Sequence, residues 1–400
     1  MNILFVNYYA SEDGGAGIST YCLAKELKEQ GLDVSFASTE KYPSFRSFVF
    51  KNFRYLPFFF LREIYLWFFL KKIIKKNNFD AIHCADSRFV SNVVIKLAKK
   101  MGLISVVHFR GYWFKCLKGD LLYHNVKKCE GMSLKKCIKC LPLHLAIWEI
   151  YKFRYFKSTL KTIKKADIKI AISEAVSREL KGSGILDARI IYDPIGKIEE
   201  KGSSRESQTQ IYKKIKNKKV ILFAGMLIYH RGIEILMEIA RSLKGKRDVA
   251  FLIVGDGEMR AYCDEKINKN NLSNVYMAGQ QKWDEMGAVF KKSDIFLFPS
   301  ILPEPFGRVS REAMAYGIPV IVSNNGGNSE GIIDGENGFL VDSNDIEKYI
   351  EKINILLDDD GLRKNIGEAG RRSLGKYEPK LIAENVKKLY EETLYDKNRK

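Results

Sequence analysis

Residues 303–307 read Pro303-Glu304-Pro305-Phe306-Gly307, and Glu312 follows Glu304 after seven intervening residues, within Arg-Glu-Ala-Met-Ala. This pattern predicts a tight turn that carries the first acid and an amphipathic helix over 309–316 that carries the second. The amino end of such a helix can bind a phosphate through its backbone amides, and carboxylates accept hydrogen bonds from sugar hydroxyls.

Apolar runs lie on both sides of this segment. Residues 295–298 precede it and residues 320–322 follow it, and both runs predict strands. Gly317 can cap the helix between them, and Pro319 cannot continue it. The order strand, loop, helix, strand places the acidic loop at the carboxyl end of a parallel strand, where open α/β sheets bind ligands.

The segment resembles the signature of the retaining glycosyltransferases of family 4, whose fold is called GT-B, and the resemblance covers nearly the whole chain. The family's Glu-x7-Glu pattern is fully present. The resemblance implies that Glu304 contacts the donor sugar and that Glu312 holds the nucleotide ribose. It also implies that the backbone after Pro305, at Phe306 and Gly307, binds the leaving diphosphate. The alternative is an acidic loop before an ordinary surface helix, which the motifs on either side argue against.

Length and charge limit the class of protein. The chain has 400 residues and a net charge of +19, which predict two domains and anionic partners. No nucleic-acid motif accompanies this charge, so the phosphates of a nucleotide sugar and an anionic membrane surface explain it better than nucleic acid does. The first residues read as a buried strand rather than a secretory signal, and no apolar run reaches about 20 residues, so we expect a cytoplasmic protein.

Strand-like and helix-like runs alternate along the chain, which predicts an α/β fold with parallel sheets. With the resemblance, this becomes a GT-B prediction: two Rossmann-like, doubly wound parallel-sheet domains facing a cleft. The predicted acceptor-binding domain covers 1–195, and a linker covers 196–218. The predicted nucleotide-sugar-binding domain covers 219–378, and a helix within 379–400 crosses back to the first domain, as in the family.

A Gly-rich loop, Gly14-Gly15-Ala16-Gly17, lies between the first predicted strand and helix. The resemblance implies that Gly15 and Gly17 face the donor diphosphate or the acceptor, since glycines let a phosphate approach the backbone. Ordinary turn glycines are the alternative. The loop lacks the full Gly-x-Gly-x-x-Gly fingerprint, which disfavours a nicotinamide-dependent oxidoreductase, although Glu40 could mimic its ribose-binding acid.

Residues 223–232 resemble the family's phosphate-gripping loop, which has Arg after its first Gly and Lys before its last. In this chain Met226 occupies the Arg position and Arg231 the Lys position. Arg231 can neutralise a departing phosphate with two hydrogen bonds, and His230 is a partial substitute for the missing cation. A solvated surface charge is the alternative for Arg231.

His108 ends a buried strand, and a polar residue at that end is expected in the cleft. It resembles the family's His that touches the donor sugar, although Phe109 replaces the Asp that follows in the family. A structural, hydrogen-bonding His is the alternative, and this is the preferred interpretation of His83, one strand earlier.

An insert over 112–142 carries four cysteines: Cys116, Cys129, Cys137 and Cys140. The last two have Cys-x2-Cys spacing, and all four together predict a structural four-thiolate zinc site, with His124 as a spare ligand. Free thiols, or a disulfide under oxidising conditions, are the alternatives, and an iron–sulfur cluster is less favoured.

The region 42–76 interleaves aromatic residues with Lys and Arg. Because Arg62 and Glu63 interrupt its apolar run, we predict that it lies on a bilayer rather than crossing it. Aromatic side chains settle at the headgroup level, and cations meet anionic lipid. An aromatic helix pair packed on the core is the alternative.

The sequence thus predicts a retaining glycosyltransferase that transfers a sugar from a UDP- or GDP-sugar to a lipid-linked or other cell-envelope glycan, with Glu304, Arg231 and His108 as catalytic residues. No bound metal is required for the chemistry, because cations and the helix dipole can stabilise the leaving diphosphate. A donor phosphate oxygen takes the acceptor proton, as proposed for the family, and the protein is expected on the inner face of the cell membrane. The alternatives are a GT-B synthase or phosphorylase with a soluble acceptor, and a catalytically silent nucleotide-sugar-binding subunit.

Overall fold

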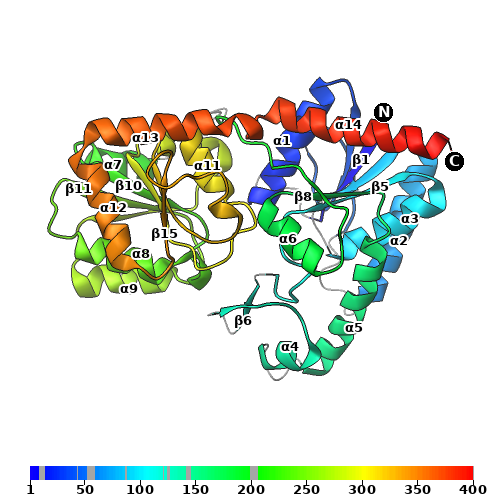
Figure 1. Cartoon of the computed structure of the whole chain (residues 1–400), viewed down its shortest axis with the longest axis horizontal. Coiled ribbons are helices and arrows are strands. Elements are labelled where there is room, and N and C mark those ends of the chain that lie inside the picture. The colour runs from blue at the N-terminus through cyan, green and yellow to red at the C-terminus, as the bar shows by residue number, and fades with distance from the viewer. Residues whose placement is uncertain are drawn as a thin grey trace. The chain divides into compact units, whose positions relative to one another are not determined.

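The computed structural model describes residues 1–8, 14–42, 44–51, 59–85, 88–119, 121–123, 127–140, 146–198 and 206–399. The chain divides into two compact units (Figure 1), unit 1 with Met1–Pro194 and Pro379–Lys400, and unit 2 with Ile195–Glu378. Each unit contains a parallel sheet with helices, so the predicted α/β class with two parallel-sheet domains is confirmed.

Unit 1 is built on a seven-stranded parallel sheet with the order β3-β2-β1-β4-β5-β8-β9. Its strands are β1 (Asn2–Val6), β2 (Asp33–Ser38), β3 (Arg46–Val49), β4 (Ala81–Cys84), β5 (Ile104–Phe109), β8 (Ile168–Ala171) and β9 (Arg189–Ile190). Every residue of β4 and β5 is buried. This is the pattern of parallel strands that helices cover on both faces.

Two apolar cores cover this sheet. The first includes side chains of α1 (Gly15–Glu29) and α14 (Pro379–Asn398), and the second includes side chains of α2 (Phe59–Lys76) and α3 (Arg88–Met101). The remaining long helices of the unit are α5 (Ala146–Ile163) and α6 (Glu174–Gly182).

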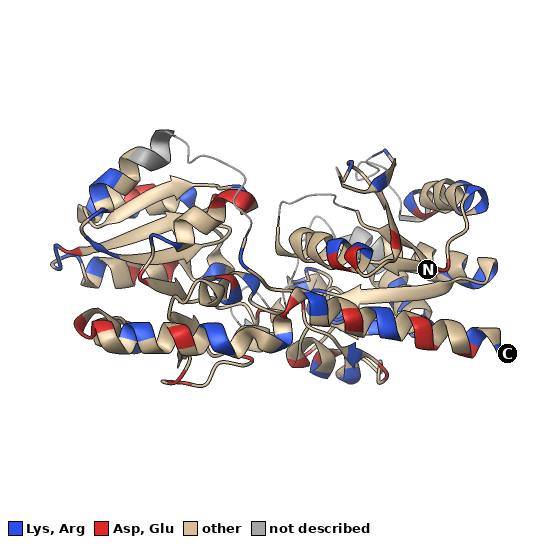
Figure 2. Ribbon diagram, turned by 90° about the horizontal axis from the view of Figure 1, so that it is seen from above, with Lys and Arg blue, Asp and Glu red and all other residues tan. Residues whose placement is uncertain are grey.

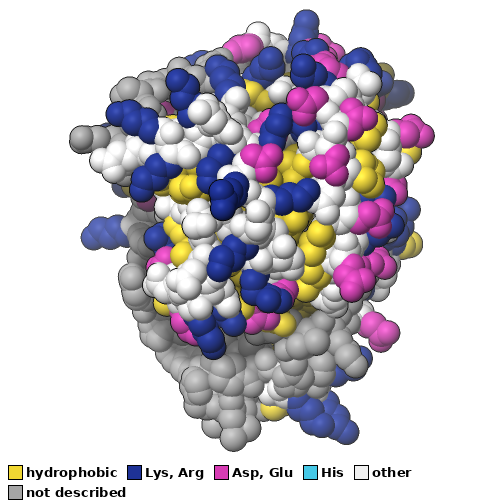
Figure 3. Space-filling model, turned by 90° about the vertical axis from the view of Figure 1, so that its left-hand side faces the viewer, with side chains coloured by type: hydrophobic (Ala, Val, Ile, Leu, Met, Phe, Trp, Pro, Cys, Tyr) yellow, Lys and Arg dark blue, Asp and Glu magenta, His cyan; other side chains and the backbone are white. Residues whose placement is uncertain are grey.

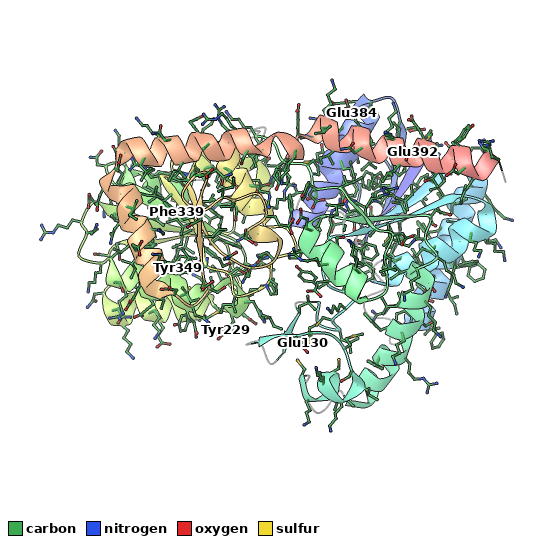
Figure 4. The ribbon with its side chains drawn as sticks, in the orientation of Figure 1. Glu130, Tyr229, Phe339, Tyr349, Glu384 and Glu392 are labelled. Atoms are coloured by element: carbon green, nitrogen blue, oxygen red, sulfur yellow. The ribbon has the colours of Figure 1, made fainter. Side chains whose placement is uncertain are left out.

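Helix α14 is part of unit 1, although it follows unit 2 in the sequence. Ile382, Val386 and Tyr390 are buried in the first core of unit 1. Glu384 and Glu392 lie on the exposed side of the helix (Figure 4), where basic and acidic residues alternate along it (Figure 2). The chain thus returns through one amphipathic helix.

The insert between β5 and α5 contains a short antiparallel hairpin, β6 (Leu122–Tyr123) with β7 (Lys127–Lys128), and then α4 (Leu134–Cys140). Residues 120, 124–126 and 141–145, and with them His124, lie outside the described part of the chain.

Unit 2 contains a six-stranded parallel sheet with the order β12-β11-β10-β13-β14-β15. Its strands are β10 (Lys219–Ala224), β11 (Val249–Val254), β12 (Val275–Gly279), β13 (Ile295–Phe298), β14 (Val320–Ser323) and β15 (Phe339–Val341). Its helices are α7 (Glu206–Ile215), α8 (Ile233–Ser242), α9 (Arg260–Asn270), α10 (Met286–Phe290), α11 (Arg308–Ala315), α12 (Ile346–Asp358) and α13 (Asp360–Arg372). Basic and acidic side chains are both present on the face of this unit shown in Figure 3, so the net positive charge is not one continuous basic surface there.

Most described aromatic residues of the region 42–76 belong to the core. Tyr42, Phe45 and Phe50 are each less than 10% exposed, so the prediction of a lipid-facing set is wrong for them. The rings of Tyr42 and Phe45 pack on Phe36 of β2, and the ring of Phe50 packs on Phe69 of α2. Residues 52–58 of this region, and 199–205 of the predicted linker, lie outside the described residues.

Helix α2 leaves one apolar stripe exposed. Phe60, Ile64 and Phe68 are 49%, 50% and 65% exposed, at intervals of one helical turn, and Lys72 continues the line. Within the described residues, no helix is long and apolar enough to cross a membrane.

Candidate functional site

The acidic loop of unit 2 joins β13 to α11. Glu304 lies in the loop and Glu312 on the helix, with exposed fractions of only 3% and 6%. Gly307 caps α11 with a φ of 75°, and a Cβ there would lie 2.1 Å from the side chain of Asn328, so only glycine fits. The helix predicted over 309–316 is therefore present, and it spans Arg308–Ala315.

Two side chains hold the carboxylate of Glu304. The hydroxyl of Ser300 donates to Oε1 at 2.8 Å, and Nη1 of Arg231 forms an ion pair with the same oxygen. The Arg231 guanidinium also lies 5.3 Å from the centre of the Phe298 ring. Two residues predicted from separate motifs, Arg231 and Glu304, are thus in direct contact.

The carboxylate of Glu312 is held in the same way. Its Oε1 accepts hydrogen bonds from Nε1 of Trp283 at 3.1 Å and from Nε of Arg308 at 2.8 Å. Arg308 is one helical turn before Glu312, and only 9% of its side chain is exposed. With two donors on Oε1, the second oxygen is the one that can accept from a bound hydroxyl.

A buried arginine fixes the backbone of this loop. Arg311 is 2% exposed, and its guanidinium donates to the carbonyl oxygens of Phe306, Gly327 and Glu330. The guanidinium also lies 4.3 Å from the centre of the Phe306 ring. Carbonyl oxygens and an aromatic face compensate the buried cation, so Arg311 stabilises the turn rather than offering a charge to a ligand.

A Gly-Gly turn contacts the acidic loop backbone to backbone. The amide of Gly327 donates to the carbonyl of Glu304 at 2.5 Å, and a Cβ on Gly327 would lie 2.3 Å from the carbonyl oxygen of Pro305. The ring of Phe306 packs on Tyr377 and is 3% exposed, so this residue can offer a ligand only its backbone.

The predicted phosphate-gripping loop follows β10. The side chain of Met226 is 59% exposed, and the 3-10 turn η2 (Tyr229–Arg231) comes next, with Tyr229 marking its place in Figure 4. The carbonyl of His230 accepts from the amide of Ile301 at 2.8 Å. This bond ties the turn to the segment between β13 and Glu304.

His108 lies inside unit 1. Its ring is fully buried, and the expected contact with a donor sugar in the cleft stays a prediction. Nε2 of His108 lies 3.9 Å from Oδ1 of Asp193, which accepts from Nε of Arg110 at 3.0 Å. Burial first, then Arg110, and then the neighbouring His83 hold the pKa of His108 well below its ordinary value, so the ring is neutral at neutral pH.

His83 is buried beside it. Its Nδ1 lies 2.5 Å from the hydroxyl of Tyr390 on α14, and its ring stacks on Phe5 with centroids 4.5 Å apart. Burial, and then the charge of Arg110, hold the pKa of His83 well below the ordinary value. These contacts fit the structural role predicted for His83.

The two predicted glycines of the first loop occupy different positions in α1. Gly15 is its first residue and is exposed, whereas Gly17, two residues further on, is buried. No side-chain hydrogen bond caps this helix at Gly14, and residues 9–13 before it lie outside the described part of the chain. A ligand contact at Gly15 or Gly17 stays a prediction.

The four cysteines of the insert gather in unit 1. Cys116, Cys129, Cys137 and Cys140 line one cavity of about 20 Å³, and all four are thiols. Burial first, and then the other three cysteines, raise the pKa of Cys137 to about 11. Among the described residues, no three His, Cys, Asp or Glu side chains are already placed to hold a metal ion together. The predicted zinc is therefore not supported by a formed coordination site.

The predicted site residues thus fall into two sets, one in unit 2 and one in unit 1. One group in unit 2 contains Arg231, His230, Glu304, the loop 305–307 and Glu312, and the other predicted residues, His108, Gly15, Gly17 and the cysteines, belong to unit 1. Sequence reasoning missed Ser300, Trp283, Arg308 and Arg311. Only Arg308 carried a signal, since it stands four residues before Glu312 on the predicted helix.

Comparison with known proteins covers both units. Residues 204–373 match the family model described as Glycosyl transferases group 1, and residues 13–195 match Glycosyltransferase Family 4. An uncharacterized glycosyltransferase of Methanocaldococcus jannaschii, MJ1178, is 34% identical over 171 residues, which are 43% of this chain and 47% of that protein. The 2-deoxystreptamine N-acetyl-D-glucosaminyltransferase of Niallia circulans is 26% identical over 326 residues, 79% of this chain and 77% of that protein. The chain spans about half the length of several curated relatives it matches, including MJ1178 and the spore coat protein SA of Bacillus subtilis.

Solved structures with a similar fold cover almost the whole chain. The Anabaena protein Alr3699/HepE in complex with UDP-glucose superposes with a TM-score of 0.73 at 18% identity, covering 98% of this chain and 100% of that chain. The sucrose-phosphate synthase from Thermosynechococcus elongatus gives a TM-score of 0.76 at 20% identity, covering 99% of both chains. At these identities the likeness shows the fold, which is the GT-B fold.

Proposed function

Because the chain belongs to the family 4 glycosyltransferases, we propose that it transfers a sugar from a nucleotide-sugar donor to an acceptor, with retention at the anomeric carbon. The observation that carries the proposal is the group in unit 2, where Arg231 pairs with Glu304 in the loop before the glycine-capped α11, and Glu312 is held by Arg308 on that helix. A cation, two carboxylates and a helix amino end supply what a diphosphate, a ribose and a sugar each need.

Glu312 is the residue proposed to bind the ribose. Trp283 and Arg308 occupy its Oε1, so Oε2 accepts from the ribose hydroxyls. Because the partners fix the carboxylate before the donor arrives, binding costs little ordering of the side chain.

Arg231 is proposed to change partners when the donor binds. Its guanidinium pairs with Glu304 in this structure, with its side chain 22% exposed, and a diphosphate offers it a doubly charged acceptor. As the glycosidic bond breaks, negative charge grows on the leaving diphosphate, and Arg231 with the backbone amides after Pro305 stabilises that charge. We propose no metal for this step, because these groups supply the positive field.

Glu304 is proposed to hold and orient the donor sugar rather than attack it. Ser300 and Arg231 bind the carboxylate at Oε1 and hold it in one orientation, in which it accepts from a sugar hydroxyl near the anomeric carbon when the donor is bound. The acceptor hydroxyl gives its proton to a phosphate oxygen of the departing group on the same face of the sugar, which gives retention. His108 is not required in this scheme, since its ring is fully buried in unit 1.

We propose a lipid-linked or other cell-envelope glycan as the acceptor, and the inner face of the cell membrane as the place of reaction. The exposed stripe of Phe60, Ile64 and Phe68, continued by Lys72, supports this, because apolar and cationic side chains on one helix face suit an anionic bilayer surface. The capsular polysaccharide biosynthesis glycosyltransferase CapM of Staphylococcus aureus, 28% identical over 185 residues, supports the same acceptor class. A soluble acceptor is the competing proposal.

A donor screen tests the activity. Purified protein is mixed with UDP- and GDP-sugars and a bacterial lipid extract, and nucleoside diphosphate release and labelled lipid are measured. The UDP-glucose complex of the Anabaena protein makes UDP-sugars the first to test. Release with one donor and label in the lipid fraction support the proposal, whereas release with label only in a soluble product removes the lipid acceptor. An anomeric NMR assignment of the product checks retention.

A catalytically silent nucleotide-sugar-binding subunit is the second candidate. Met226 favours it, because an exposed thioether occupies the position at which the family has a phosphate-binding cation. Binding of a nucleotide sugar without release under every condition supports this candidate. Any zinc held by the four cysteines of the insert would be structural in both cases, since four thiolates leave no open coordination position.

A further inference from the structure

We propose that the four-cysteine cluster of unit 1 (Cys116, Cys129, Cys137 and Cys140) binds one zinc ion in a four-thiolate site that fixes the insert after β5. This inference does not depend on sugar transfer, because it concerns residues outside the proposed donor group.

Four separate positions of the insert converge on one cavity. Cys116 ends the turn after β5, and its amide donates to the carbonyl of Tyr112 at 2.9 Å. Cys129 follows β7, and Cys137 and Cys140 lie on α4. The backbone that carries the thiols is therefore set by hydrogen bonds and helix geometry, although 13 positions separate Cys116 from Cys129 in the sequence.

The size and lining of this cavity suit a single small ion. Its volume of about 20 Å³ is close to the space that one water molecule needs. Thiolate sulfur is the ligand that zinc prefers, with Zn–S distances of about 2.3 Å in a tetrahedron. Since no three of the side chains are yet in coordination geometry, we expect the ion to draw the sulfurs together from positions around the cavity they already share.

The surroundings balance the charge of such a site. Four thiolates with one Zn²⁺ carry two net negative charges, and Lys118 and Lys136 line the same cavity. Further lysines of the insert stand near in sequence, at 115, 135 and 139. A net negative cluster among lysines is electrostatically favourable, and it would add to the contacts that Lys118 and Lys136 already make with Leu122 and Glu130.

The helix and strands in the described part of the insert are short. Its hairpin strands have two residues each, and α4 has seven residues with Cys137 as its buried residue. Tyr112, Phe114, Leu121 and Leu122 are buried in its first part, and a metal or disulfides commonly hold small scaffolds with elements this short. A four-thiolate zinc joins the hairpin, the preceding turn and α4, and it leaves no open position for catalysis.

Metal analysis of the full-length protein tests the site. The protein is expressed with added zinc, purified with a phosphine reductant and without chelator, and measured by plasma mass spectrometry. We expect about one zinc per chain. The same content is expected in Cys263→Ala, a buried cysteine of unit 2, and a content of less than about a tenth in the double variant Cys137→Ala, Cys140→Ala, which keeps too few sulfur ligands.

Two further measurements test the site even if the double variant does not fold. Cys129→Ser, at a partly exposed position, should lower the zinc content of a folded protein. A metal-free wild type that also shows no thiolate-to-cobalt absorption when Co²⁺ is added under reduction would overturn the site, and iron in place of zinc would overturn the identity of the ion.

The stabilising role has its own measurement. Removing zinc from the wild type with a chelator should lower its thermal midpoint, and adding zinc should restore it. Nucleotide binding should not change, because Glu304 and Glu312 belong to unit 2. An unchanged midpoint would show that the ion does not hold the insert.

Discussion

Glu304 is oriented by a serine that the family signature does not mention. The Ser300 side chain is fully buried, and its hydroxyl is the neutral donor to Oε1, while Arg231 is the charged one. If Arg231 turns to the diphosphate of a donor, Ser300 remains as the group that keeps the carboxylate in place. Ser300 is therefore a positioning residue in this account.

Ser300→Ala should weaken both the fold and the geometry of the site. A buried carboxylate loses one donor, which costs about 1–3 kcal/mol of unfolding free energy. We also expect kcat to fall by about tenfold or more with a smaller change in KM, because the lost bond orients the reacting sugar. Steady-state kinetics and thermal unfolding measure both effects.

The matched control is Ser242→Ala, an exposed hydroxyl that bonds to a carbonyl within α8. It should change stability by less than about 0.5 kcal/mol and leave kcat unchanged. A Ser300→Ala enzyme with wild-type kcat would show that Arg231 alone positions Glu304.

The buried histidines of unit 1 predict a pH dependence of stability. The pKa values of His83 and His108 are lowered in the folded protein, so below the ordinary value of about 6.5 the unfolded chain binds more protons than the folded one. The free energy of unfolding should therefore decrease as the pH is lowered below about 6.5, by up to about 1.4 kcal/mol per pH unit for each histidine.

Thermal midpoints at pH 7.5, 6.5 and 5.5 check this expectation. His108→Gln should flatten the loss between pH 6.5 and 5.5, because one titrating ring is removed. A variant with the same pH slope as the wild type would contradict the assignment of the loss to His108.

Residue identities could be predicted from the sequence where a local pattern carries them. Glu304, Glu312 and Arg231 stand in such patterns, and the structure places Arg231 on Glu304. Ser300 and Trp283 could not be found, because their importance depends on which side chain they reach in the folded unit. The burial of His108 was missed for the same reason. His83 beside it bonds to Tyr390, which is 307 residues away in the sequence.

Helix α2 exposes three apolar side chains in line along one face. Its inner face carries Leu66 and Leu70, both at most 1% exposed, and its outer face carries Phe60, Ile64 and Phe68. The helix departs from the usual amphipathic pattern, since part of the face away from the core is also apolar. That composition predicts a binding surface rather than a solvated one.

Phe68→Ser should reduce flotation of the protein with anionic vesicles by several-fold, because a 65% exposed ring contributes apolar area to the bilayer contact. Added salt should weaken binding of the wild type, since Lys72 and its neighbours meet lipid phosphates. The control is Leu186→Ser, which removes a 73% exposed side chain elsewhere in unit 1. If both variants lose vesicle binding equally, or if the wild type does not bind vesicles, the exposed face of α2 is not a membrane-binding surface.

Element type was easier to predict than element environment. Alternating apolar runs and turn glycines mark the strands and helices of both sheets, because local sequence fixes periodicity. Which aromatic residue of 42–76 faces the core depends on the neighbouring strands, so Phe45 and Phe50 could not be told from Phe68. The same limit applies to the cysteines, whose convergence needs the fold of the insert.

The whole chain is organised so that its last helix completes its first unit. Residues 379–400 belong to unit 1, and Val386 is fully buried there. The first sheet therefore cannot bury both faces until the end of the chain is present. This long-range closure predicts that unit 1 depends on α14 and unit 2 does not.

Val386→Asp should destabilise unit 1 by about 3 kcal/mol or more, because it buries an unpaired charge in the core. Nucleotide binding, carried by unit 2 in this account, should persist. Leu381→Asp, at a 40% exposed position of the same helix, is the control and should have little effect. Amide hydrogen exchange, measured for each unit, tests this prediction. Equal protection of the amides of unit 1 in both variants would contradict the dependence of unit 1 on α14.

The central claim is that the group around Glu304 carries out sugar transfer. The most direct test compares nucleoside diphosphate release by the wild type, Glu304→Ala and Glu265→Ala, an exposed acid on α9, with the donor found in the screen. We expect Glu304→Ala to keep its fold by circular dichroism and to lose about a hundredfold or more of the rate, while Glu265→Ala matches the wild type. A folded Glu304→Ala protein with the wild-type rate of release and transfer would contradict it.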